Sequence, residues 1–232
     1  MHGESFQAPQ EAQTFMNVLE HIVENLNVGG AMVYPLIVLS ILSLAIISDR
    51  AYTYWRFARL APSLRDIIES YEFSWGELEK LMKGSDTKNI FVRFFHIITT
   101  NRTRPVWWVE SRAADEAGLI EKVLGRGMWA LDTTVTAAPL LGLLGTIIGM
   151  ISSFNLFGSH GLVNPTGITG GVAQALIATA LGIVIALFSL FAFNFFSRLQ
   201  SQTLDEMERL GTRLVTRIQM DHHELESAHE AA

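Results

Sequence analysis

The chain has 232 residues, of which 49% are hydrophobic and 17% are charged, and its formal net charge is −6. It contains no cysteine, which excludes disulfides, thiolate metal sites and cysteine nucleophiles. Basic residues are scattered among acidic ones, a pattern that argues against nucleic-acid binding. There is no phosphate-binding glycine loop, catalytic triad or zinc motif, so we expect no enzymatic activity, no cofactor and no metal.

Residues 1–28 are predicted to form an amphipathic segment. Apolar residues recur at helical spacing between Phe15 and Leu26, with Glu20 and Glu24 among them. Such a segment fits the surface of a membrane. An ordinary surface helix packed against the same protein is the alternative.

A first membrane-spanning helix is predicted over residues 29–50. The segment from Asn25 to Ser48 carries no charge, and roughly 20 apolar residues suffice to cross a bilayer as a helix. Asp49 and Arg50 end this span abruptly, and we expect them to anchor it at the membrane interface.

Residues 51–127 are predicted to form a cytoplasmic helical region. Helices are expected over 74–81 and 88–99, and a break is expected over 102–105. From about Trp107 a long helix is expected to run directly into the second span, because no helix stop precedes Asp132.

The uncharged block from Thr133 to Ser197 predicts a transmembrane helical hairpin. It contains no Asp, Glu, Lys or Arg and is long enough for two crossings. We place the second span over 128–157, a turn rich in Gly over 158–169, and the third span over 170–197. Beyond it, an apolar residue recurs every three or four positions, so the third helix is expected to continue to about Leu225 within a cytoplasmic extension over 198–232.

The positive charges predict the orientation of these spans. All 17 Lys and Arg residues lie either between Arg50 and Arg126 or between Arg198 and Arg217. The positive-inside rule places both segments in the cytoplasm. Residues 1–28 and the turn at 158–169 are then periplasmic, and the C-terminus is cytoplasmic.

Small residues line one face of each hairpin helix, where they allow two helices to approach closely in lipid. Pro139 removes one backbone hydrogen bond inside the second span and is expected to kink it. We therefore predict a tightly packed, oligomer-prone hairpin. Its packing residues are Gly142, Gly145 and Gly149 in the second span and Ala175, Ala178, Gly182 and Ala186 in the third.

Two threonines are the candidate ion-pathway residues of the hairpin. Thr146 and Thr179 lie at similar distances from the turn, so an antiparallel hairpin brings them to similar depth. A single threonine in a membrane helix usually bonds a carbonyl of its own helix. Two hydroxyls at one depth could instead line a polar path, where they could relay or coordinate an ion but could not store charge.

Three segments carry a resemblance to a known family. The run LDTTVTAAPLLGLLGTIIGMISSF at 131–154 closely resembles the second-span signature of the MotA/TolQ/ExbB proton-channel family. The run GGVAQALIATALGIVIALFSLFAFNFF at 170–196 is similar to its third-span signature, and residues 29–52 resemble the first span of the ExbB-like branch. MotA-type stators have four spans, so the three predicted spans fit the ExbB/TolQ branch.

The resemblance implies an all-α membrane protein that forms a homo-pentameric ring of long helices. The second and third spans would line a pore around a single-span ExbD- or TolR-like partner, whose membrane Asp takes up and releases protons. Thr146 and Thr179 match the pore threonines of the family. The implied function is to convert the proton motive force into work for an envelope or outer-membrane process, with a TonB- or TolA-like protein as a possible further partner.

One residue departs from the family pattern. The residue before the ALxATA motif is usually glutamate in this family, and here it is Gln174. Glutamine does not titrate, so every charge-storing group would have to come from the partner, with Gln174 supplying only hydrogen bonds. The departure leaves two alternatives open, namely a sodium-driven subunit and a non-conducting membrane scaffold that organises a partner protein.

Overall fold

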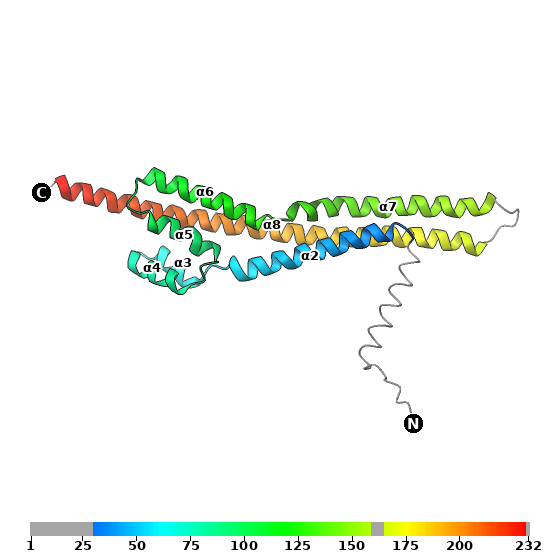
Figure 1. Ribbon diagram of the computed structural model, residues 1–232, viewed down its shortest axis with the longest axis horizontal. Coiled ribbons are helices and arrows are strands. Elements are labelled where there is room, and N and C mark those ends of the chain that lie inside the picture. Colours follow the sequence, from blue (N-terminus) through cyan, green and yellow to red (C-terminus); the bar gives the residue numbers. More distant parts are fainter. Residues whose placement is uncertain (1–29, 159–164, 231–232) are drawn as a thin grey trace, which may run out of the picture. The chain divides into compact units, whose positions relative to one another are not determined.

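The computed structural model describes residues 30–158 and 165–230, and every regular element within these ranges is a helix (Figure 1). The predicted amphipathic segment at 1–28 and residues 159–164 of the predicted turn lie outside the described residues, whereas residues 165–169 of that turn belong to α8. The helices are α2 (Val33–Phe57), α3 (Pro62–Glu69), α4 (Trp75–Gly84), α5 (Ile90–Thr100), α6 (Val106–Leu124), α7 (Met128–Gly158) and α8 (Pro165–Glu230).

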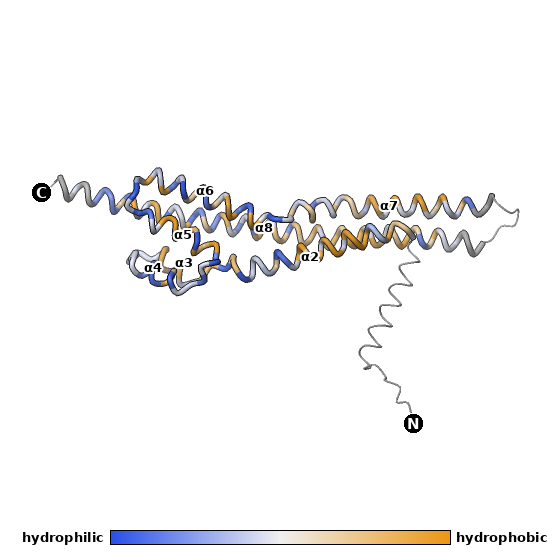
Figure 2. The backbone as a smooth tube through the Cα atoms, viewed as in Figure 1, coloured by the Kyte–Doolittle hydropathy of each residue, from blue (hydrophilic) through white to orange (hydrophobic). Residues whose placement is uncertain are grey.

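Three helical stretches are long and apolar enough to cross a membrane. They are Val33–Phe57, the stretch Val106–Asn155 that ends in α7, and Thr169–Glu224 within α8. Figure 2 shows hydrophobic residues running along α2 and α7. The prediction of an all-helical protein with three candidate membrane spans is confirmed. The third helix also continues well past its apolar part, as expected, and ends at Glu230.

The chain divides into two compact units. The first, which we call the apolar unit, comprises the described residues up to Leu44 together with Ala130–Phe191. The second, which we call the charged unit, comprises Ala45–Trp129 and the described residues from Ala192 onward. Within the apolar unit, Leu36 of α2, Ala138 of α7 and Ala186 of α8 form a buried cluster, so all three helices contribute to one core.

In the charged unit, short helices α3 to α6 pack with the polar half of α8. The apolar stripe of α8 is buried here, since Leu210, Leu214 and Ile218 are each at most 1% exposed. Both helices predicted before Pro105 are present as α4 and α5. Asn89 begins α5 because its side-chain oxygen accepts hydrogen bonds from the amides of Phe91 and Val92.

Ion pairs add to this packing at the surface of the charged unit. Arg209 of α8 lies 2.6 Å from the carboxylate of Glu69 at the end of α3. The hydrogen bond from Arg209 is the main reason that the pKa of Glu69 lies below its usual range. Similarly, the pKa of Asp86 is lowered, first by a hydrogen bond from the Lys88 amide and then by Arg56. Both carboxylates are therefore ionised near neutral pH.

The expected continuous helix from Trp107 into the second span is wrong. The chain leaves α6 at Leu124, turns through Gly125–Gly127, and begins α7 at Met128. Gly127 has φ of +80°, a left-handed conformation that residues with a Cβ rarely adopt. A Cβ at this position would also lie 3.3 Å from the Ile46 side chain. Glycine therefore permits both the turn and its close packing on α2.

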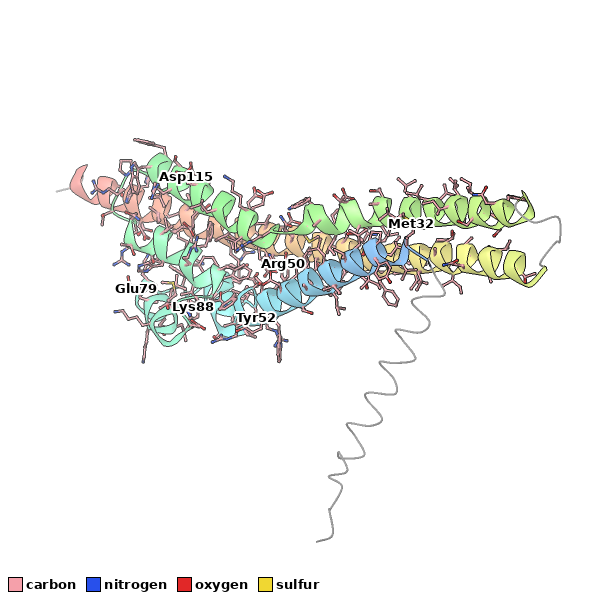
Figure 3. The ribbon with its side chains drawn as sticks, turned by 45° about the vertical axis from the view of Figure 1, so that its right-hand side comes forward. Met32, Arg50, Tyr52, Glu79, Lys88 and Asp115 are labelled. Atoms are coloured by element: carbon pink, nitrogen blue, oxygen red, sulfur yellow. The ribbon has the colours of Figure 1, made fainter. Side chains whose placement is uncertain are left out.

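Arg50 is buried within α2, and its predicted role as an anchor at the membrane interface stays a prediction. Helix α2 continues past it to Phe57, and Arg50 is only 3% exposed. Its Nη1 donates to the carbonyls of Val123 (2.7 Å) and Leu124 (3.0 Å), and its Nη2 donates to Asp49 (2.5 Å). Carbonyls in the last turn of a helix have no intrahelical partner. Arg50, labelled in Figure 3, therefore caps α6 from α2.

Replacing this cap should destabilise the charged unit. Arg50→Met keeps much of the side-chain volume but removes the donor from the buried Leu124 carbonyl and from the part-buried Val123 carbonyl, at an expected cost of about 1.5–3 kcal/mol. The measurement is the thermal unfolding midpoint of the detergent-solubilised protein. The matched control is Arg56→Met, because Arg56 is on the same helix and is half-exposed in an ion pair with Asp86. We expect that change to cost less than about 1 kcal/mol. Equal effects of the two substitutions would contradict the capping role.

Candidate ion-pathway site

The small residues of α7 and α8 face one another along the interface of the two helices (Figure 1). A Cβ built on Gly145 would lie 2.7 Å from the Ala178 Cβ, and one built on Gly149 would lie 2.8 Å from the Ala175 Cβ. A Cβ on Gly182 would lie 2.5 Å from the Ala138 carbonyl oxygen. These helices pack backbone to backbone at positions where any larger side chain would separate them.

Helix α7 continues through Pro139 without a break between Met128 and Gly158. Proline has no amide hydrogen, so one carbonyl in the preceding turn lacks its helical partner. Ala138, directly before it, is fully buried and is the residue on which Gly182 packs. The proline therefore lies next to a position where the two hairpin helices pack closely.

Thr179 joins the two hairpin helices by a hydrogen bond. Its hydroxyl donates to the carbonyl oxygen of Gly142 on α7 over 2.9 Å. In an α-helix this same carbonyl accepts the amide of the residue four positions on, which is Thr146. The bond is possible because a glycine at 142 leaves the carbonyl open to the neighbouring helix. A Cβ at that position would lie 3.0 Å from the Thr179 Cα.

The Thr146 hydroxyl donates within its own helix, to the carbonyl of Leu143 at 2.6 Å. Thr146 and Thr179 thus lie within one helical turn of each other, on neighbouring helices. Both hydroxyl hydrogens are directed at backbone carbonyls. Each hydroxyl oxygen still has a lone pair that can accept a hydrogen bond or coordinate a cation. The pair can therefore act as an acceptor site that carries no charge.

Gln174 lies elsewhere on α8. A Cβ on Gly30, three residues before α2, would lie 2.6 Å from the Gln174 side-chain nitrogen. Gln174 and Thr179 are five positions apart, so helical rotation directs their side chains about 140° apart. Met32, directly before α2, lies against Gly145, 3.2 Å from the position of its Cβ. Gln174 therefore lies against the residues that precede α2, whereas Thr179 bonds α7 one turn from Thr146.

The interface is electrically neutral apart from its ends. No Asp, Glu, Lys or Arg occurs between Thr133 and Ser197, and Asp132 at the start of this block is exposed. Within residues 30–158 and 165–230, no group of three or more His, Asp or Glu side chains could hold a metal ion. Any proton or cation in this region would consequently meet only hydroxyl, amide and carbonyl groups of this chain.

Two further polar contacts of the apolar unit were not anticipated from the sequence. The Ser189 hydroxyl donates to Ser43 of α2 over 3.2 Å, and both residues are buried. Ser153 donates to the carbonyl of Gly149 over 2.9 Å and lies directly against Gly171. Ser189 lies seven residues beyond Gly182, on the same face of α8 that carries the small residues. This spacing is the sequence feature from which its contact could have been predicted.

Comparison with known proteins identifies relatives over most of the chain. Residues 89–209 match the model of the MotA/TolQ/ExbB proton channel family. The chain is 32% identical to the protein named ExbB-like 3 of Synechocystis sp. over 74% of this chain and 82% of that protein. It is 29% identical to ExbB-like 1 of the same organism over 86% of this chain and 80% of that protein. It is also 35% identical to the biopolymer transport protein ExbB of Aquifex aeolicus, over 48% of this chain and 68% of that protein.

Proposed function

Because the chain belongs to the MotA/TolQ/ExbB proton channel family, in its ExbB branch, we propose that it is the ion-conducting subunit of an inner-membrane motor. In this proposal five copies form a ring around a single-span partner similar to ExbD or TolR. Proton flow through the complex is converted into mechanical work on an envelope or outer-membrane process, such as TonB-dependent transport. The C-terminus is cytoplasmic, in agreement with the two basic segments.

The observation that carries this proposal is that the Thr179 hydroxyl bonds the Gly142 carbonyl of α7, one helical turn before Thr146, whose own hydroxyl bonds the adjacent Leu143 carbonyl. A pathway for protons needs groups that accept hydrogen bonds in a region where water is scarce. Because placing polar groups in hydrocarbon costs free energy, such groups in a membrane helix indicate a function. Both threonines satisfy their hydroxyl hydrogens internally and keep acceptor lone pairs. A protonated carboxyl on the partner could therefore donate a hydrogen bond to either threonine. When the carboxyl then moves away, neither threonine carries a charge.

An interface without Asp, Glu, Lys or Arg supports a titrating group on the partner. Gln174 takes the position of the family's glutamate and lies near Gly30, so in this proposal it contributes no charge to the pathway. The Asp expected in the partner's span would then be the group that takes up a proton on one side and releases it on the other. This chain would provide the fixed surface against which that carboxyl moves.

The test measures which subunits the complex contains and which ion gradient drives its process. The tagged chain, purified from its native membranes, is expected to have five copies by native mass spectrometry and to bring with it a single-span protein with an Asp in its span. A protonophore should stop the energised process, whereas replacing sodium by potassium should not. Strict dependence on sodium would contradict the proton assignment. A complex whose process continues without either gradient would identify a non-conducting scaffold.

A further inference from the structure

An open groove runs between α6 and α8 on the charged unit, with a volume of about 640 Å³. Its floor is made of small residues, among them Ala113 and Ala117 of α6 and Gly211 of α8. Gly211 is closely packed, because a Cβ there would lie 2.9 Å from the ring of Phe94. Small side chains spaced four apart on α6 thus leave a concave strip that can accommodate side chains of another helix.

The rim of this groove is acidic. Glu110, Glu121 and Glu208 line it, and no Lys or Arg does. Within the described residues, none of these three carboxylates is in an ion pair. Several other carboxylates of the unit are paired, such as Glu69 with Arg209 and Glu79 with Arg102. The groove therefore presents uncompensated negative charge above an apolar floor, which favours a partner surface with basic and apolar residues.

The opposite flank of α6 has these complementary properties. Leu119 and Val123 are exposed by 51% and 48% respectively. Ala117 and Leu119 are two positions apart on α6, so their side chains point about 160° apart around the helix axis. Basic residues surround the two apolar side chains. We call this surface the α6 ridge, and it consists of Arg112, Leu119, Lys122 and Val123 of α6 and of Arg126 in the turn that follows α6, with Asp115 beside Arg112 (Figure 3).

We propose that the acidic groove of one copy binds the α6 ridge of the next copy. The two surfaces lie on opposite flanks of one helix, so their pairing is head-to-tail, and repeated head-to-tail contacts close into a ring when the rotation per subunit allows. Leu119 and Val123 would insert between the small residues of the floor, and Arg112 and Arg126 would face the glutamates of the rim. The inference rests on the proposed function for its ring, and it assigns the residues that select the neighbour.

Cysteine cross-linking tests this contact directly, because the natural chain has no cysteine. The variant carries Ala114→Cys in the groove and Leu119→Cys on the ridge. A disulfide inside one copy is excluded, since five residues of helix extend about 7.5 Å and a bridge needs Cα atoms within about 7 Å. Mild oxidation of the full-length variant in membranes should give a ladder of covalent oligomers. The control replaces Leu119→Cys by Gly84→Cys, at an exposed site on α4, and should give none.

Charge reversal gives a second readout on the same variant. Glu208→Lys or Arg126→Glu alone should reduce cross-linking by about tenfold, because each places like charges face to face. Both changes together should restore it.

The outcomes distinguish this inference from the proposed function. A ring seen by native mass spectrometry without the ladder would overturn the groove–ridge contact and leave the motor proposal intact. A chain that does not self-associate would overturn both. Cross-links from the groove only to a different protein would show that another partner occupies it, and would also overturn the inference.

Discussion

Gly182→Ala is expected to push α7 and α8 apart and to destabilise the apolar unit. The new methyl group would lie 2.5 Å from the carbonyl oxygen of Ala138 and close to the Cα of Gly142. Both neighbours are backbone, so neither can rotate away as a side chain could. Alanine favours a helix over glycine by about 0.8–1.0 kcal/mol, whereas overpacking a tight core costs about 1–3 kcal/mol. We therefore expect a net loss and, with the larger Gly182→Leu, failure of the ring to assemble.

The matched control for this change is Gly170→Ala, twelve residues earlier on the same helix. Nothing lies within 4 Å of a Cβ at that position, so only the helix propensity should act and the protein should be as stable or slightly more stable. The measurements are the thermal midpoint in detergent and the oligomer distribution. If Gly182→Ala and Gly170→Ala behave alike, the helices are not packed backbone to backbone at Gly182.

Thr179→Val and Thr146→Val are expected to abolish energised transport while leaving the complex assembled. Valine keeps the shape of threonine and removes the hydroxyl. The Gly142 carbonyl that loses the Thr179 bond still has its helical partner, so the stability cost should be near the average of about 0.6 kcal/mol for such bonds in membranes. The Thr146 bond lies within one helix, and its loss should cost still less. We expect transport to fall at least about a hundredfold in each variant, the lower end of the effect of positioned groups in proton transfer.

Two controls separate the hydroxyl from packing in this experiment. Thr179→Ser keeps the oxygen and should retain most transport. Thr136→Val removes a hydroxyl that also donates within α7, to the carbonyl of Thr133, on an exposed face, and it should have no effect. Full transport in both single valine variants and in the double variant would refute the role of the threonine pair.

Much of this fold could be predicted from the sequence, because a lipid bilayer restricts which backbone structures can cross it. A bilayer offers no hydrogen-bond partners, so long uncharged segments must be helical, and three of them were recognisable from charge and length. The spacing of Gly142, Gly145 and Gly149 also indicated one close-packing face. Periodicity places a residue on a face of its helix, and small residues identify the face that packs. The buried stripe of α8 followed from the same periodicity between Leu199 and Ile218.

The tertiary structure decided where particular side chains bind. Gln174 was grouped with the two threonines in the sequence analysis, and the tertiary structure shows that the Gln174 side chain lies near Gly30, before α2. The sequence likewise indicated no partner for Arg50, because the carbonyls at the end of α6 lie more than seventy residues away along the chain. The turn at Gly127 was missed because glycine allows a left-handed conformation without requiring it, so the residue type alone does not predict the turn. Helix formation and amphipathic faces are local properties of the chain, whereas hydrogen bonds and close contacts between helices exist only once the helices have packed.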